Sequence, residues 1–153
     1  MQNDSDASSI NEKEIMDYYG YNGQFGKLKL KAKLLRSWIL HSAAYSLPHT
    51  GIVVKLQRSR GVKIGKNCHI SPYVLIDLVY PGLITIFDNV TIGSNVMIFA
   101  HSNPTANLFL KQGKYSRKTA QVTIKSGAVL NPGCIITAGV TIGENSMVSV
   151  GSV

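Results

Sequence analysis

The sequence predicts a mainly β fold, a parallel β-helix solenoid of hexapeptide repeats that follows an N-terminal α-helical segment. The main observation is an aliphatic residue that returns every six positions in the second half of the chain, with two interruptions. These residues are Ile64, Ile70, Ile76, Ile86, Ile92, Ile98, Ile124, Leu130, Ile136, Ile142 and Val148. A period of six fits neither a helical turn nor a flat alternating strand, so a short unit repeats and must stack to bury these side chains.

Two further columns of the repeat support this interpretation. Three positions after the aliphatic residue, eight of eleven units carry asparagine or glycine, which tolerate a positive φ: Asn67, Asn89, Asn95, Gly127, Gly133, Gly139, Asn145 and Gly151. Four positions after it, a second inward column holds Cys68, Val74, Val90, Val96, Ala128, Cys134, Val140 and Ser146. The chain therefore turns a corner in each repeat, and the short strands between corners pair with the coils above and below.

The first part of the chain has a different pattern. Residues 1–10 are polar and are expected to be disordered, and residues 11–60 are expected to be helical, starting at a capping box of Asn11 and Glu14. Between residues 27 and 47, apolar residues recur at spacings of three and four, which predicts an amphipathic helix: Leu28, Ala32, Leu35, Ile39, Ala43 and Leu47. This apolar stripe is expected to pack on the rest of the chain, with contact to a membrane surface as the alternative.

The hexapeptide-repeat region spans residues 61–153 and is interrupted twice. Ile86 follows Ile76 by ten positions, and a break of twenty-six positions follows Ile98. If three hexapeptides make one coil, both insertions leave the solenoid at the same corner, one coil apart. The longer insertion gives a loop over residues 101–121, and loops of this length without their own structure are usually functional or disordered.

Composition limits the classes of partner and compartment. The chain has no apolar run of about 18 residues and no signal-peptide pattern, so neither a membrane span nor secretion is predicted. Two cysteines, Cys68 and Cys134, are too few for a disulfide framework and favour the reducing cytoplasm.

Ten of the sixteen basic residues lie between Lys27 and Lys66, where no Asp or Glu occurs. This basic block is either a solvated helix face or attracts an anionic partner, such as a lipid headgroup, a phosphorylated carrier or an acidic polysaccharide; no nucleic acid is predicted.

The repeat units resemble those of a known enzyme family. Ile64-Gly65-Lys66-Asn67, Ile92-Gly93-Ser94-Asn95 and Ile142-Gly143-Glu144-Asn145 are similar to the repeats of the hexapeptide-repeat acyltransferases, and the resemblance covers residues 61–153. The nearest subgroup is the sugar O-acetyltransferases, similar to the maltose, galactoside and xenobiotic acetyltransferases. The resemblance implies a left-handed β-helix, a homotrimer and acetyl-CoA bound between subunits. It also implies acetyl transfer to a hydroxyl of a sugar or surface-polysaccharide precursor. Because the family continues beyond this point with a turn and a basic tail, the chain is expected to be truncated at its C-terminus.

His101 is the candidate general base. It stands at the root of the long loop, in the column where most units carry asparagine or glycine, and residues 96–104 resemble the family segment that holds the catalytic histidine. An alcohol becomes a good nucleophile only when a base takes its proton, and an imidazole titrates near neutral pH. The alternative is a structural corner residue, because histidine tolerates a positive φ.

The remaining site residues have two origins. Tyr73, Asp77 and Asn103 flank the corner of the long loop and are expected to contact the acceptor, with turn or loop residues as the alternative. The resemblance implies that the CoA arm lies along the late coils, at Ala138, Gly139, Ser149 and Gly151. No metal is predicted, because Cys68 and His69 lack the further ligands that a metal site requires. The competing function is a non-catalytic trimeric scaffold that docks on a membrane or a partner through its basic helical segment.

Overall fold

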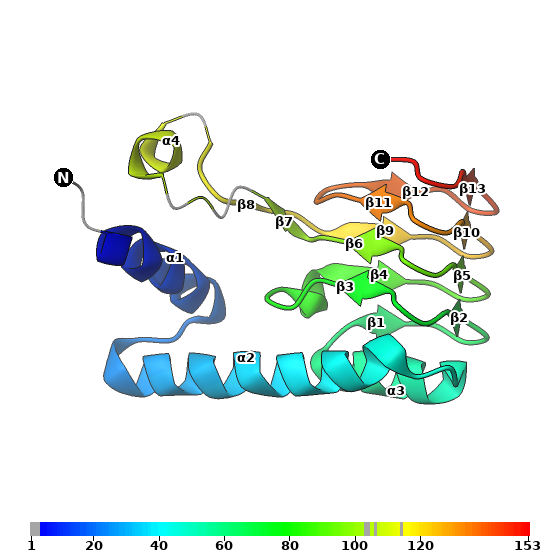
Figure 1. Ribbon diagram of the computed structural model, residues 1–153, viewed down its shortest axis with the longest axis horizontal. Coiled ribbons are helices and arrows are strands. Elements are labelled where there is room, and N and C mark those ends of the chain that lie inside the picture. The colour runs from blue at the N-terminus through cyan, green and yellow to red at the C-terminus, as the bar shows by residue number, and fades with distance from the viewer. Residues whose placement is uncertain (1–3, 103–104, 106, 114) are drawn as a thin grey trace.

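The computed structural model describes residues 4–102, 105, 107–113 and 115–153, and for residues 4–7 the backbone alone. Three helices form its N-terminal part: α1 (Asp4–Tyr19), α2 (Gly23–Ser46) and α3 (Thr50–Arg60). Figure 1 shows α2 lying across the base of a stack of short strands and extending beyond it, with α1 folded back above its free end. Helix α3 contacts α2 and the first strands of the stack.

The start of α1 differs from the prediction. The sequence predicts disorder for residues 1–10 and a helix from Asn11, but α1 begins at Asp4; residues 1–3 lie outside the described part of the chain. Residues 4–10 contain neither glycine nor proline, so nothing in their sequence interrupts the helical backbone. Asn11 and Glu14 lie within the helix and form no capping box there; their side chains instead accept hydrogen bonds from the long loop.

The strands of the stack form three parallel sheets. Their bounds are β1 (Lys63–Ile64), β2 (His69–Ile70), β3 (Leu75–Ile76), β4 (Ile84–Ile86), β5 (Thr91–Ile92), β6 (Met97–Ile98), β9 (Val122–Ile124), β10 (Val129–Leu130), β11 (Ile135–Ile136), β12 (Thr141–Ile142) and β13 (Met147–Val148). The sheet orders are β1-β4-β9-β12, β13-β10-β5-β2 and β11-β6-β3. Each aliphatic residue of the six-residue column pairs with its equivalent one coil away, as Ile76 does with Ile98 and Ile98 with Ile136. The predicted coils are therefore confirmed.

The inside of the solenoid is filled by the two predicted inward columns. The aliphatic column is completely or almost completely buried from Ile70 to Leu130, and Val90, Val96, Ala128 and Cys134 of the second column are fully buried beside it. The corner column also behaves as predicted, because all eight of its asparagine and glycine residues have positive φ. Tyr73 takes a φ of 65° at the equivalent corner although its side chain disfavours it.

Both insertions leave the corner between the third sheet and the first, as predicted. The shorter one follows β3 and contains a 3-10 turn, η1 (Pro81–Leu83). The longer one follows β6 and holds β7 (His101–Ser102), α4 (Leu108–Gln112) and β8 (Lys118–Thr119). Strands β7 and β8 pair antiparallel, so the long loop is an arm that carries α4 towards α1 (Figure 1).

The predicted apolar stripe of α2 does not face the rest of the chain. Leu28, Leu35 and Ile39 are 66%, 56% and 52% exposed. The buried face of α2 lies opposite and holds mainly small or polar residues, Gly26, Leu30, Ser37, His41 and Ala44. Close approach decides the orientation: a Cβ on Gly26 would lie 2.9 Å from the Tyr21 backbone. No described helix is long and apolar enough to cross a membrane.

Arg60 at the end of α3 is buried and joins α2 to the first coil. Its guanidinium donates to Ser37 Oγ and to His41 Nδ1 in α2, at 3.2 and 3.0 Å. It also donates to the backbone oxygens of Ile76 and Asp77, at 3.1 and 2.6 Å. Burial, and then the charge of Arg60, lower the pKa of His41 to about 4, so His41 is neutral and accepts the Arg60 hydrogen bond.

We expect the free energy of unfolding to fall as the pH drops from 6.5 towards about 4. In this window the unfolded chain binds a proton at His41 and the folded chain does not, which destabilises the fold by up to about 3 kcal/mol. Urea denaturation over this range should show a weaker pH dependence for His41→Gln than for the wild type. His49→Gln, at an exposed position, is the control and should keep the wild-type dependence. An unchanged dependence in His41→Gln would contradict this assignment.

Candidate functional site

The candidate site lies at the corner from which both insertions leave. Asp77 follows β3, and His101 begins β7 one coil above it. His101 occupies a strand position and does not take the positive φ of the corner column, so the alternative of a structural corner residue is wrong. The imidazole Nδ1 lies 2.6 Å from Asp77 Oδ2.

Asp77 is fully buried and binds four donors. Oδ1 accepts the backbone N–H groups of Val79 and Tyr80 at 2.8 and 2.9 Å, and Oδ2 accepts the Ala100 N–H at 2.9 Å as well as His101. Burial alone raises the pKa of Asp77, but the hydrogen bonds from His101, Tyr80 and Ala100 outweigh it, and the pKa lies below its ordinary value. Asp77 is therefore a carboxylate at neutral pH.

This carboxylate fixes the orientation and tautomer of His101. Because a carboxylate only accepts hydrogen bonds, Nδ1 of a neutral His101 carries the proton and Nε2 keeps its lone pair. The His101 side chain is 16% exposed, and Nε2 has no hydrogen-bond partner among the residues that the structure describes. The pair thus presents a base with its orienting group, the arrangement that general-base catalysis needs.

A hollow of about 280 Å³ is lined by two neighbours of His101, although neither His101 nor Asp77 lines it. Tyr80, in the short insertion, lines it and contacts the His101 ring edge-on with the ring centroids 5.3 Å apart. Thr119, which also lines it, is the partner of His101 across the β7–β8 ladder. The other lining residues are Glu14, Asp17, Tyr18, Ser116 and Arg117. Carboxylates, hydroxyls and an exposed aromatic ring can bind the hydroxyls and faces of a sugar.

Helix α1 forms one wall of this hollow and is held there by charged side chains of the long arm. Glu14 Oε2 accepts from Lys111 Nζ at 2.8 Å and from Arg117 Nε at 2.9 Å. Asn11 Oδ1 accepts from the same two side chains at 2.6 and 3.1 Å. Lys111 is buried, so these contacts hold the arm against α1.

The structure separates the predicted acceptor residues. Asp77 does not contact an acceptor, contrary to the prediction, because its side chain is fully buried and its oxygens are occupied; it positions His101 instead. Tyr73 lies at a different corner, between β2 and β3, where its ring packs on Tyr45 of α2, so it is not beside His101. Asn103 lies outside the described residues.

The predicted CoA residues lie at two edges of the solenoid. Ala138 and Gly139 form the corner one coil above the root of the arm, and a Cβ on Gly139 would lie 3.5 Å from that of Ala120. Ser149 and Gly151 lie at the corner between the second and third sheets. Within one chain, only Ala138 and Gly139 share the edge that carries His101.

Sequence reasoning missed the residues that surround the hollow. Tyr80 could have been found, because the short insertion was predicted to lie beside the long one. Glu14 and Asp17 carried no such signal, since their position depends on contacts between residues about a hundred positions apart. Among the described residues, no group of three or more His, Cys, Asp or Glu side chains could hold a metal ion.

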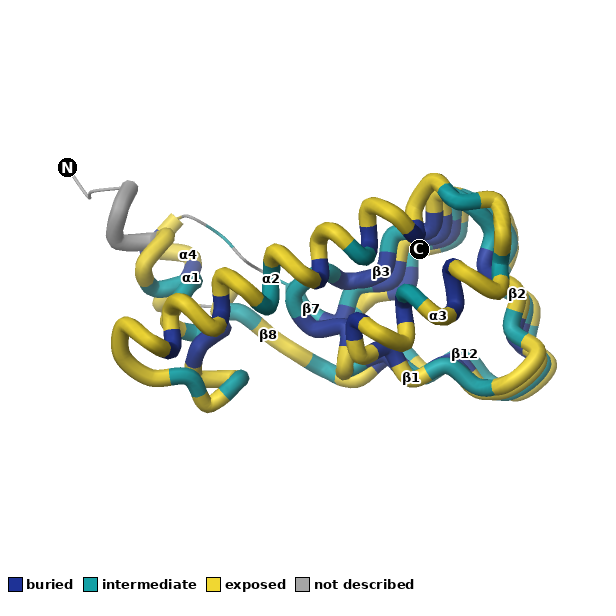
Figure 2. Tube along the Cα trace, turned by 90° about the horizontal axis from the view of Figure 1, so that it is seen from below, coloured by how far each residue is buried: buried dark blue, intermediate teal, exposed yellow. Residues whose placement is uncertain are grey.

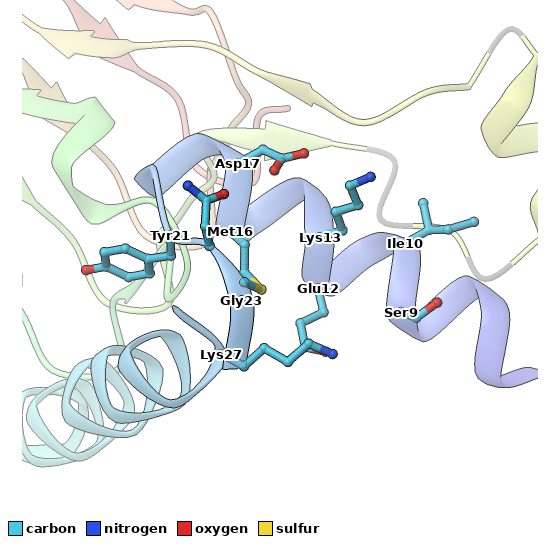
Figure 3. Close-up of a pocket in the computed structure, with 10 residues that line it drawn as sticks. Ser9, Ile10, Glu12, Lys13, Met16, Asp17, Tyr21, Gly23 and Lys27 are labelled. Carbon is cyan, nitrogen blue, oxygen red and sulfur yellow. The ribbon is translucent and has the colours of Figure 1, made fainter. Parts of the chain in front are cut away.

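A second hollow, of about 370 Å³, lies between α1 and the start of α2 (Figure 3). Glu12 and Lys27 approach each other across its rim at 3.4 Å, and Met16 and Tyr21 line it. Unlike the first hollow, it is lined by neither Tyr80 nor Thr119, the neighbours of His101.

No protein-family model matches the sequence, and the curated proteins give no match. Solved structures do match. One is the hexapeptide-repeat acetyltransferase VCA0836 of Vibrio cholerae O1 biovar eltor complexed with acetyl coenzyme A, with a TM-score of 0.62 and 19% identity over 79% of this chain and 75% of that one. Another is galactoside acetyltransferase in complex with coenzyme A, with a TM-score of 0.60 and 25% identity over 81% of this chain and 71% of that one. The resemblance predicted from the repeats is confirmed: the chain has the left-handed β-helix fold of the hexapeptide-repeat acetyltransferases.

Proposed function

We propose that this protein is an acetyl-CoA-dependent acetyltransferase that acylates a hydroxyl of a sugar or surface-polysaccharide precursor. The observation that carries the proposal is the His101–Asp77 pair, in which Nε2 has no hydrogen-bond partner among the described residues. Two neighbours of His101, Tyr80 and Thr119, line a polar hollow. The galactoside acetyltransferase and VCA0836 were solved with CoA or acetyl-CoA, which supports the same donor here.

The residues of the site perform the proton transfers of such a reaction. Acetyl-CoA, when bound, supplies the acetyl group, whose bond to sulfur breaks as the bond to the acceptor oxygen forms. His101 Nε2 takes the proton of the acceptor hydroxyl in the transition state and returns it to the departing thiolate. Asp77 keeps Nδ1 protonated and stabilises the imidazolium while it exists.

The acceptor is proposed to occupy the hollow between α1 and the arm. There the Tyr18 ring, which is 43% exposed, offers a face to a pyranose ring, and Asp17 offers a carboxylate to its hydroxyls. Both residues lie on α1, outside the repeats, so α1 would select the acceptor.

We also propose a homotrimer in the cytoplasm. The predicted CoA residues lie at two edges of one chain, and a groove between neighbouring subunits would bring an edge of each together. Cys68 and Cys134 are free thiols, in keeping with a reducing compartment.

Acetyl transfer is tested by following thiol release from acetyl-CoA with a panel of galactosides, glucosides and maltosides, and by identifying the acetylated product by mass spectrometry. We expect release that depends on the sugar and exceeds the hydrolysis seen without acceptor. Light scattering on the same sample measures the molar mass, which should be that of a trimer. Failure to bind acetyl-CoA in calorimetry, together with no product from any sugar, would favour the non-catalytic scaffold.

A further inference from the structure

The outward face of α2 carries an exposed apolar stripe, formed by Phe25, Leu28, Leu35 and Ile39. These side chains are 83%, 66%, 56% and 52% exposed, and their spacing places them along one line of the helix. Figure 2 views the molecule from the base of the solenoid and shows α2 across this end, with most of its residues exposed. The stripe lies opposite the face through which α2 contacts the rest of the chain.

Basic residues border the stripe on both sides. Because each residue of an α-helix is rotated by about 100° from the one before it, Lys29 and Arg36 lie along one edge of the stripe and Lys31 lies along the other. All three are exposed, and no hydrogen bond or ion pair joins them to a described residue. The remaining lysines of the helix, Lys27 and Lys33, instead contact α1, through an ion pair and a cation–π contact.

An apolar line between two basic margins matches the interface of an anionic lipid bilayer. Apolar side chains enter the boundary between headgroups and acyl chains, while lysine and arginine extend to the phosphates. Trp38, which is 56% exposed and lies next to the Lys31 margin, has the amphipathic ring that favours this boundary. A second copy of α2 would bring like charges together, and a nucleic acid would leave the apolar line uncovered.

We propose that the protein binds anionic membrane surfaces through the α2 stripe, with Lys29, Lys31 and Arg36 on lipid phosphates. The base of the solenoid then rests on the membrane, and the coils extend away from it (Figure 1). This contact is independent of His101, because the stripe and the candidate site lie on different parts of the chain.

Vesicle flotation tests the contact on the full chain. We expect binding to equimolar phosphatidylglycerol–phosphatidylcholine vesicles and little binding to phosphatidylcholine alone. Added salt should weaken binding, because ions screen the lysine and arginine charges. Trp38 is the single tryptophan of the chain, so its emission should shift to the blue on binding and become protected from a soluble quencher. No flotation with the anionic vesicles would overturn the proposal.

Two variants separate the apolar and ionic parts of the contact. A stripe variant, Leu28→Ser, Leu35→Ser and Ile39→Ser, should bind at least about tenfold more weakly, since each change removes apolar burial. A charge variant, Lys29→Gln, Lys31→Gln and Arg36→Gln, should lose on the order of 100-fold.

The matched control replaces exposed apolar residues elsewhere, Phe109→Ser and Met147→Ser, which are 82% and 72% exposed in the wild type. It should bind as the wild type does, and circular dichroism should show all variants folded. Wild-type binding by the stripe variant would refute the proposal. A change in oligomeric state by sedimentation velocity, with unchanged vesicle binding, would assign the stripe to a second copy of the chain instead.

Discussion

Replacing His101 with alanine should lower kcat/KM for acetyl transfer by about 10²- to 10⁴-fold, the contribution typical of a general base. The acceptor hydroxyl would then have to lose its proton to water while the acyl bond forms. The loss should fall on kcat, because the walls of the hollow remain and acceptor binding does not require the imidazole. Steady-state kinetics with the best acceptor of the sugar panel measures it.

His69→Ala is the matched control for this substitution. His69 is an exposed histidine of the same solenoid, on β2, and its Nδ1 contacts Thr50 Oγ1 at 3.0 Å, away from the root of the arm. Its loss should leave kcat unchanged. If His101→Ala keeps wild-type turnover but unfolds at lower temperature, then His101 only anchors the arm through Asp77 and the catalytic assignment is wrong.

The solenoid could be predicted from the sequence because its geometry repeats. Each six-residue unit imposes the same constraints: one aliphatic residue inside, one small or branched residue beside it, and one corner residue that tolerates a positive φ. The registers that pair Ile76, Ile98 and Ile136 follow directly from counting. Left-handedness did not follow from the pattern, since general chain topology favours right-handed crossovers; it came from the family resemblance and from the structural matches.

The helical part could be predicted only in outline. A stripe at spacings of three and four shows that a helix has an apolar face, but not whether that face is turned to the core or to solvent. In α2, Gly26 and Ser37 decide this, because they permit a close approach and a hydrogen bond to the Leu78 backbone. Such residues give no hydrophobic signal, so the predicted core face of Leu28, Leu35 and Ile39 is in fact exposed.

The candidate site was only partly predictable. His101 was found from its place at the root of an insertion and from the resemblance. The sequence also places Asp77 at this corner but predicts that it touches the acceptor, because sequence does not show whether a carboxylate is buried. The contacts of α1 with the arm could not be predicted, since they join two segments with no shared pattern.

Asp77→Asn should reduce kcat by about 10²- to 10⁴-fold, although asparagine has the same shape as aspartate. The carboxylate accepts two hydrogen bonds on each oxygen. An amide has one oxygen, so its NH₂ group must face either the Val79 and Tyr80 amides or the Ala100 amide and His101. In the second orientation, His101 Nδ1 would have to accept a hydrogen bond from the new NH₂ group. The imidazole proton would then sit on Nε2, and Nε2 could no longer act as the base.

The same substitution should lower the free energy of unfolding by about 2–4 kcal/mol, because buried donors lose their acceptor and a buried charge network is broken. Asp88→Asn is the control: Asp88 is exposed and accepts the Lys66 amide at 2.7 Å at another corner, so its replacement should leave kcat unchanged. Urea denaturation and steady-state kinetics on the two variants separate the structural effect from the catalytic one.

The pair can also be tested as a unit. If Asp77 acts through His101, then the double variant Asp77→Asn/His101→Ala should lose no more activity than His101→Ala alone.

The stability contribution of Asp77 has a defined pH dependence. Because its pKa is depressed in the folded state, the contribution is complete above the ordinary value of 3.8 and disappears as the pH falls through the lower folded value. The free energy of unfolding of the wild type minus that of Asp77→Asn should be constant at neutral pH and shrink only in acid, which supports the buried carboxylate. A difference that already shrinks between pH 7 and 5 would contradict it.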